Sequence, residues 1–163
     1  MSLHTVSFRP DHLGITVPDL DDAVSFFVEV LGAQLLYSEG PVSDQGDWMS
    51  RQLNVHPRAE LRATMLRMGG SFRLELFEYV VPDQDRGWPQ NSDWGGSHLA
   101  LEVPDIHATI ERLRTVPGVR VMGDVHETEE APGVIVLWIY FTTPWGMQLE
   151  LVSPKVGAAT TDG

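Results

Sequence analysis

Two stretches of the chain, DHLGITVPDL at residues 11–20 and SHLALEVPDI at residues 97–106, follow one pattern. Each has a histidine at the head of an alternating segment that ends at Pro-Asp. Alternation with a period of two predicts a β-strand, and an aspartate after the proline is a favoured helix N-cap. We therefore expect a strand and then a helix in each stretch. His12 and His98 should lie on the strand face opposite the leucine and valine side chains.

The two stretches belong to an internal repeat. His98 follows His12 by 86 positions (98 − 12), and the same offset aligns further residues without a gap. These pairs are Leu13/Leu99, Val17/Val103, Pro18/Pro104, Asp19/Asp105, Leu20/Ile106, Val24/Ile110, Phe27/Leu113 and Gly32/Gly118. An ordered set of this kind predicts a duplicated structural unit, with the paired glycines closing the two helices.

Three strand-like segments follow each predicted helix. They are AQLLY, LRATMLRM and FRLELFEYV in the first half, and RVMG, VIVLWIYF and MQLELVS in the second. Glycine lies in the last turn of each half, GGS and PWG, as tight hairpins favour. The sequence therefore predicts an α+β fold of two tandem βαβββ modules, which form a curved, cup-shaped mixed sheet with the helices on its outer face.

The predicted organisation is a single domain over residues 1–163. It comprises module one at about 9–81, a linker at 82–97, module two at about 98–153 and a tail at 154–163. The linker contains proline and glycine and lacks periodicity. The segment from Glu39 to Glu60 is longer than its counterpart and is a candidate lid or pocket wall. The acidic run GDVHETEE at 123–130 is expected to be a solvated loop.

Glutamates in the last strand of each half are expected to face the same way as the histidines. RLELF at 73–77 aligns with QLELV at 148–152, and the leucines that flank each glutamate should point into the helix-packed layer. The non-helical face of the sheet would then carry His12, Glu75, His98 and Glu150. Two imidazoles and two carboxylates suit one divalent ion such as nickel, cobalt, zinc, manganese or iron, and the chain has no cysteine.

Other side chains near this face are candidates for substrate binding. Arg73 shares the face of Glu75 and either pairs with an anionic substrate group or neutralises a glutamate. Tyr79, Trp138 and Tyr140 are candidates to line the cup, for packing or for recognition. The remaining histidines are expected on the surface: His4, His56, His107 and His126. Among them, His56 lies in the long segment that can fold over the cup.

Composition limits the partners of the protein. A formal net charge of −12 argues against nucleic acid, which needs a clustered basic surface. No apolar run approaches the ~20 residues of a membrane helix, and MSLHTVSFRPD lacks the pattern of a signal peptide. We therefore expect a cytoplasmic protein whose partner is a small molecule, with no nucleic acid and no membrane.

These motifs resemble the vicinal oxygen chelate superfamily, which includes glyoxalase I, extradiol dioxygenases, methylmalonyl-CoA epimerase, fosfomycin-modifying enzymes and bleomycin-binding proteins. The most specific pieces are DHLGITVPDLDDAVSFFVEVLG, LELFEY, SHLALEVPDI and TPWGMQLELVSP. The resemblance implies one divalent metal ion that chelates two adjacent substrate oxygens, and a homodimer. Carried over by position, the ligands would be His12, Glu75, His98 and Glu150.

The resemblance leaves three functions open. The expected one is an isomerase (epimerase) or lyase that acts on a small carbonyl substrate through a metal-chelated enediolate, with Glu75 or Glu150 as the base. The ligand set is similar to bacterial glyoxalase I, whereas LELFEYVVPDQ with YFTTPWGMQLELVS resembles small epimerases of valiolone-type cyclitol ketones. The alternatives are an iron-dependent extradiol dioxygenase, for which Glu75 would be surplus, and a metal-free, drug-binding protein. The complete ligand set favours the first.

Overall fold

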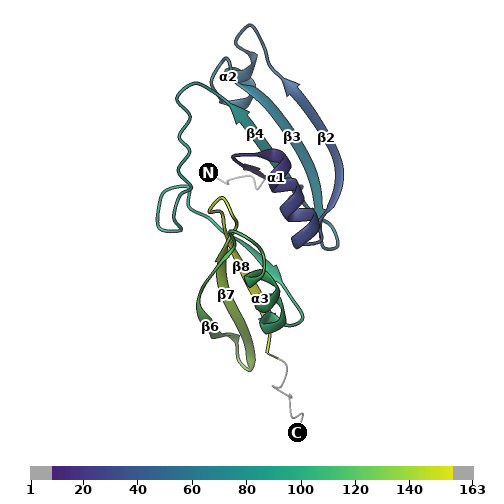
Figure 1. Cartoon of the computed structure of the whole chain (residues 1–163), viewed down its shortest axis with the longest axis vertical. Coiled ribbons are helices and arrows are strands. Elements are labelled where there is room, and N and C mark those ends of the chain that lie inside the picture. The colour runs from purple at the N-terminus through teal and green to yellow at the C-terminus, as the bar shows by residue number, and fades with distance from the viewer. Residues whose placement is uncertain (1–8, 156–163) are drawn as a thin grey trace, which may run out of the picture. The chain divides into compact units, whose positions relative to one another are not determined.

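A computed structural model of the chain describes residues 9–155. The chain divides into two compact units, one up to Arg86 and one from Gly87 on (Figure 1). The first contains β1 (Leu13–Thr16), α1 (Leu20–Ser25), the π-helix η1 (Phe26–Val30), β2 (Gln34–Val42), α2 (Trp48–Leu53), β3 (Glu60–Met68) and β4 (Phe72–Val80). The second contains β5 (Leu99–Glu102), α3 (Ile106–Arg114), β6 (Arg120–Ala131), β7 (Val134–Thr142) and β8 (Gln148–Pro154).

Both units have the same sheet topology. The strand orders are β1-β4-β3-β2 and β5-β8-β7-β6. The first strand of each unit runs parallel to the last, and the other neighbours are antiparallel. Each sheet is therefore mixed, and the predicted α+β fold with tandem βαβββ units is confirmed, α2 being an addition in the first.

A helix covers one face of each sheet. The side chains of Asp19 and Asp105 accept hydrogen bonds at 2.9 Å from the backbone N–H three residues on, so both act as the predicted N-caps. The apolar stripe of each helix packs on inward-facing sheet residues. In the first unit the fully buried members include Phe27, Leu66, Leu74 and Leu76, and in the second Ile106, Ile139, Phe141, Leu149 and Leu151. Burying each such side chain stabilises the fold by about 1.5–3 kcal/mol.

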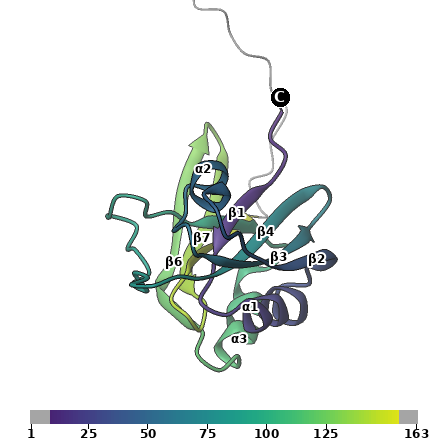
Figure 2. The same ribbon diagram turned by 90° about the horizontal axis from the view of Figure 1, so that it is seen from above.

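The segment at 39–60, predicted as a lid or pocket wall, packs on the other face of the first sheet. Met49 of α2 is 0% exposed and lies in one apolar cluster with Leu61, Ala63, Phe77 and Tyr79. Leu61 pairs with Tyr79 and Ala63 with Phe77 across β3 and β4. Figure 2 shows α1 and α2 on opposite sides of this sheet. The helix α2 therefore packs on the sheet face opposite to α1, which is the face that carries Glu75.

Two local predictions are wrong. The acidic run at 123–130 is part of β6, because its backbone pairs with β7 from His126 to Ala131 although few of its side chains are apolar. Gly118 does not close α3, which ends at Arg114. Gly32, by contrast, comes directly after Leu31, the C-cap residue of the helical segment, at φ +73°. In the part of the chain from residue 9 to 155, no helix is long and apolar enough to cross a membrane.

Candidate metal centre

His12 and Glu75 lie next to each other at the β1 edge of the sheet in the first unit. His12 lies one residue before β1, and Gly14 of β1 pairs with Glu75 of β4 in parallel register. This register brings the imidazole alongside the carboxylate, with His12 Nε2 3.1 Å from Glu75 Oε2. The Glu75 side chain is 14% exposed, against 39% for His12. The pair therefore has a largely covered carboxylate and an imidazole open to solvent.

The second unit repeats this pair. Ala100 of β5 pairs with Glu150 of β8, and His98 precedes β5 by one residue. His98 Nε2 lies 3.1 Å from Glu150 Oε2, again with the carboxylate 14% exposed. The sequence repeat is thus matched by a repeat in side-chain geometry.

The structure brings each of the two histidines together with the glutamate of its own unit. Within the described part of the chain, no group of three or more His, Cys, Asp or Glu side chains is arranged to hold a metal ion. Each unit therefore contributes one nitrogen and oxygen pair, and the four-residue ligand set stays a prediction.

Asp11 connects the first pair to Arg73. Asp11 Oδ2 lies 2.8 Å from His12 Nδ1 and also accepts a hydrogen bond from Nη2 of Arg73. The hydrogen bonds with His12 and with Arg73 hold the pKa of the Asp11 carboxyl below its usual value. The hydrogen bond with Asp11 also raises the pKa of Arg73. Arg73 therefore pairs with Asp11, a carboxylate that was not predicted from the sequence, and its expected roles toward a substrate or a glutamate stay predictions.

Asn91 takes the equivalent place beside His98. Its side-chain amide lies 3.3 Å from His98 Nδ1. The position that matches Asp11 in the repeat is Ser97 (97 − 11 = 86), so the repeat supplies no carboxylate there. An uncharged amide from the predicted linker at 82–97 contacts this histidine instead.

A row of aromatic rings leads away from His98 across the second sheet. The ring centroid of His98 lies 5.0 Å from that of Tyr140, which lies 5.4 Å from Trp138. His126 of β6 stacks on Trp138 at 4.9 Å and 23°. Trp138 Nε1 donates to Thr128 Oγ1 at 2.8 Å, so its N–H group is engaged, and His126 covers one face of the indole. The predicted substrate residues Trp138 and Tyr140 therefore lie on the same face as Glu150.

Burial and charge raise the pKa of both predicted tyrosines above a value that already keeps a phenol protonated at neutral pH. Burial first, and the negative charge of Glu75 second, raise the pKa of Tyr79. Burial first, and Glu150 second, likewise raise the pKa of Tyr140. Tyr79 also stacks on Phe77 at 5.7 Å and 24°. Both phenols are consequently hydrogen-bond donors over the whole neutral range.

The other histidines differ in their settings. His56 Nδ1 accepts a hydrogen bond from the backbone N–H of Arg58 at 3.0 Å, within its own loop. His107 lies on α3, and His4 lies outside the described residues. His126 is exposed, as expected, but belongs to a strand and to the aromatic row, which corrects its assignment to an acidic loop.

Sequence reasoning missed Asp11, Asn91 and the aromatic contact of His126. Asp11 was detectable in principle, since it directly precedes a candidate ligand and Arg73 lies two residues before Glu75 on the same strand. Asn91 gave no such signal because it lies in a segment without periodicity. The ring contact of His126 gave none either, because it depends on the pairing between β6 and β7.

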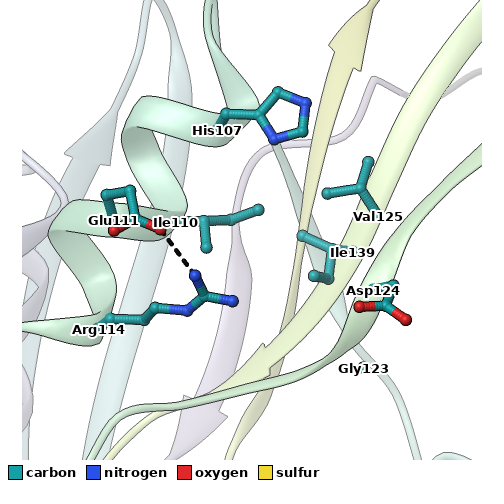
Figure 3. Close-up of a pocket in the computed structure, with 8 residues that line it drawn as sticks. All are labelled: His107, Ile110, Glu111, Arg114, Gly123, Asp124, Val125 and Ile139. Carbon is teal, nitrogen blue, oxygen red and sulfur yellow. Dashed lines mark hydrogen bonds and ion pairs between the residues drawn. The ribbon is translucent and has the colours of Figure 1, made fainter.

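A cavity in the second unit lies away from these pairs (Figure 3). It measures about 240 Å³ and lies between α3 and a bulge of β6. Its apolar floor includes Ile110 and Ile139, and Ile139 pairs with the inward-facing Leu151. Arg114 on its rim donates to Glu111 at 2.7 Å. The cavity therefore belongs to the helix-covered face, opposite to Glu150.

Comparisons with known proteins agree with the fold and with the sequence motifs. A 2-epi-5-epi-valiolone epimerase from Actinomyces sp. is 54% identical over 148 residues, which cover 90% of this chain and 80% of that protein. A glyoxalase family protein from Bacillus cereus matches with a TM-score of 0.73 at 23% identity, covering 94% of this chain and 99% of that one. A fosfomycin resistance protein from Listeria monocytogenes, complexed with manganese(II) and sulfate, matches with a TM-score of 0.51 at 15% identity, covering 95% and 96%.

The family comparison covers most of the sequence. The model of the glyoxalase/bleomycin resistance protein/dioxygenase superfamily matches residues 11–135, which include the His12 and Glu75 pair and His98. The family resemblance expected from the motifs is confirmed. The chain belongs to the glyoxalase/bleomycin resistance protein/dioxygenase superfamily.

Proposed function

We propose that this protein is a divalent-metal-dependent epimerase of a cyclitol ketone of the valiolone type. The observation that carries the proposal is the 54% identity, over 90% of the chain, to a 2-epi-5-epi-valiolone epimerase. That relationship supports an isomerase-type enzyme. The two His–Glu pairs, each with 3.1 Å between donor atoms, support the metal dependence.

The donor atoms in the structure fit a first-row divalent ion. Two ligand atoms bound at right angles, each about 2.1 Å from one ion, lie about 3 Å apart. The Nε2–Oε2 separation is 3.1 Å in both pairs. Imidazole and carboxylate donors without thiolate suit manganese, cobalt, nickel, zinc or iron. His12, Glu75, His98 and Glu150 are therefore the proposed ligands.

The reaction requires removal and return of a proton at the carbon next to the ketone. A divalent ion held by these residues would supply positive charge that favours loss of this proton. The base must be a carboxylate within reach of the carbon, and Glu75 and Glu150 are the candidates, each 14% exposed beside its histidine. We propose that one of them removes the proton while the other stays a ligand, and that the epimer forms when a proton is delivered to the opposite face of the carbon.

Side chains beside the two pairs are proposed to bind the substrate. The protonated phenols of Tyr79 and Tyr140 can donate hydrogen bonds to substrate hydroxyl or carbonyl oxygens. The N–H of Trp138 is bonded to Thr128, so Trp138 would contact the C–H groups of a saturated ring through the indole face that is not stacked on His126. Arg73 is occupied by Asp11, so its proposed part in binding is indirect. We also propose a cytoplasmic homodimer as the working form.

Proton NMR in deuterium oxide tests the proposed function. The full chain, freed of metal and then supplied with manganese(II), cobalt(II), nickel(II) or zinc(II), is mixed with 2-epi-5-epi-valiolone. We expect deuterium to enter at the carbon next to the ketone and an epimer to accumulate with at least one ion. If no ion gave either deuterium exchange or an epimer, the proposal would be contradicted. Iron-dependent oxygen consumption with a catechol would instead favour the dioxygenase alternative.

A further inference from the structure

We propose that Asp11 is a positioning residue for His12, that Arg73 holds Asp11 in place, and that Asn91 takes the weaker, uncharged version of this role beside His98. This inference rests on the proposed function, since it concerns how the two candidate ligand histidines are oriented. In this proposal, the histidine of the first unit has a charged partner, Asp11, and the histidine of the second unit has a neutral one, Asn91.

The geometry around His12 shows how Asp11 would act once a metal ion is bound. Both ring nitrogens face carboxylate oxygens: Nδ1 lies 2.8 Å from Asp11 Oδ2, and Nε2 lies 3.1 Å from Glu75 Oε2. A carboxylate can only accept hydrogen bonds, so each contact favours an N–H group on its nitrogen. A metal ion on Nε2 would leave one N–H, and Asp11 would hold that proton on Nδ1. Asp11 thereby presents the metal-binding nitrogen toward the partner carboxylate and increases its donor strength.

Arg73 fixes the carboxylate that does this. It lies on β4 two residues before Glu75, so both side chains project from the same face of the sheet. Its Nη2 donates to the same Asp11 oxygen that contacts His12. Asp11 precedes β1 and is itself 65% exposed, so its position depends on these contacts rather than on burial. The guanidinium therefore anchors an exposed carboxylate beside the histidine.

The second unit has a different arrangement. Asn91 Nδ2 lies 3.3 Å from His98 Nδ1, and a half-turn of the side-chain amide would put Oδ1 there to accept the Nδ1–H. An amide carries no charge, so it orients the imidazole but adds less to its donor strength than a carboxylate does. The His12 half should therefore contribute more to metal affinity than the His98 half.

Calorimetric titration of the metal-free full chain with cobalt(II) and with zinc(II) tests this. Loss of such an outer partner typically lowers metal affinity by about 10–100-fold. We expect a loss of this size for Asp11→Ala, a smaller loss for Asp11→Asn, which keeps an accepting oxygen, and the smallest for Asn91→Ala. Asn91→Asp should bind more tightly than the unmodified chain. Asp21→Ala is the matched control, because the ion pair of Asp21 among residues 9–155 is also with an arginine, Arg62, and not with a candidate ligand histidine.

Unfolding temperatures of the metal-free variants separate positioning from a general structural effect. Asp11→Ala and Asp21→Ala should unfold at similar temperatures while differing in affinity. Equal affinity of these two variants, with the unmodified chain still binding metal, would overturn the inference and leave the proposed function intact. Equal losses for Asp11→Ala and Asn91→Ala would overturn the difference between the halves. No binding by the unmodified chain would remove the proposed function and this inference together.

Discussion

His12 Nε2 lies 3.1 Å from Glu75 Oε2, across the parallel pair β1 and β4. A histidine and a glutamate from the second half, His98 and Glu150, have the same separation in the same register. The repeat in side-chain geometry is expected from a duplicated unit, since both pairs lie at the same place in the same parallel register. Under the proposed function, each pair supplies one nitrogen and one oxygen ligand of the metal ion.

Replacing either glutamate by glutamine should reduce epimerisation strongly. Glu75→Gln and Glu150→Gln remove a charge and a base but keep the size of the side chain. The expected loss in kcat is about 10²–10⁴-fold for the residue that moves the proton. Initial rates by NMR measure this, with Glu39→Gln as a control on the same sheet face, opposite Ala63. Full turnover in both variants would exclude a carboxylate base from this pair.

Removing the indole of Trp138 should weaken substrate binding. Trp138→Ala deletes the ring face between Tyr140 and His126. We expect KM to rise about 5–10-fold, since one ring contact is worth roughly 1 kcal/mol, with a smaller change in kcat. Trp138→Phe should restore most of the binding. Trp94→Ala is the control, because Trp94 is fully exposed. An unchanged KM in Trp138→Ala would show that the substrate does not reach the aromatic row.

Tyr79 should titrate late, and the Glu75 charge should contribute to this. Burial and Glu75 raise its pKa above the ordinary value of 10.0. Absorbance at alkaline pH, in a Tyr37→Phe, Tyr140→Phe background, reports this phenol alone. Glu75→Gln should lower the pKa part of the way, because burial, the larger cause, remains. Since the folded pKa is the higher one, stability is retained below the unfolded pKa and is lost as pH rises through the folded value. A pKa indifferent to Glu75→Gln would contradict the charge contribution.

The paired glycines Gly32 and Gly118 should differ in their tolerance of alanine. Both have positive φ, +73° and +80°, which costs an L-residue about 1–2 kcal/mol. A Cβ at Gly118 would lie 2.9 Å from Pro144 Cβ, whereas at Gly32 it meets nothing within 4 Å. Urea unfolding should therefore show that Gly118→Ala destabilises by about 1 kcal/mol more than Gly32→Ala. Equal effects would mean that the loop carrying Gly118 relaxes freely.

The order of elements within each unit could be predicted from the sequence because the signals for it are local. Alternation, Pro-Asp caps and turn glycines predicted the order of elements, and β4 spans the same residues as the predicted segment FRLELFEYV. The first residues of β6 were predicted as the strand RVMG, but its acidic remainder was missed because backbone pairing with β7 holds it and its side chains carry no apolar pattern. The helix α2 was missed because its only buried residue is Met49, which gives no periodic stripe.

The candidate site was predictable to the level of its pairs and no further. The matched leucines around Glu75 and Glu150 fixed the direction of the carboxylates, and the structure places each beside the expected histidine. The neighbours of the histidines were not predictable in this way. Asp11 and Asn91 occupy non-equivalent positions in the repeat, so alignment of the two halves gives no reason to compare them.

The metal content of the purified chain tests the central claim most directly. The protein is prepared without chelators or a nickel column, reconstituted with each candidate ion, and analysed for bound metal after desalting. The account predicts about one equivalent of a divalent first-row ion in the unmodified chain and none in the His12→Ala, His98→Ala double variant. A His56→Ala, His107→Ala double variant should keep its metal. No metal in the unmodified chain, or equal metal in the His12→Ala, His98→Ala variant, would contradict it.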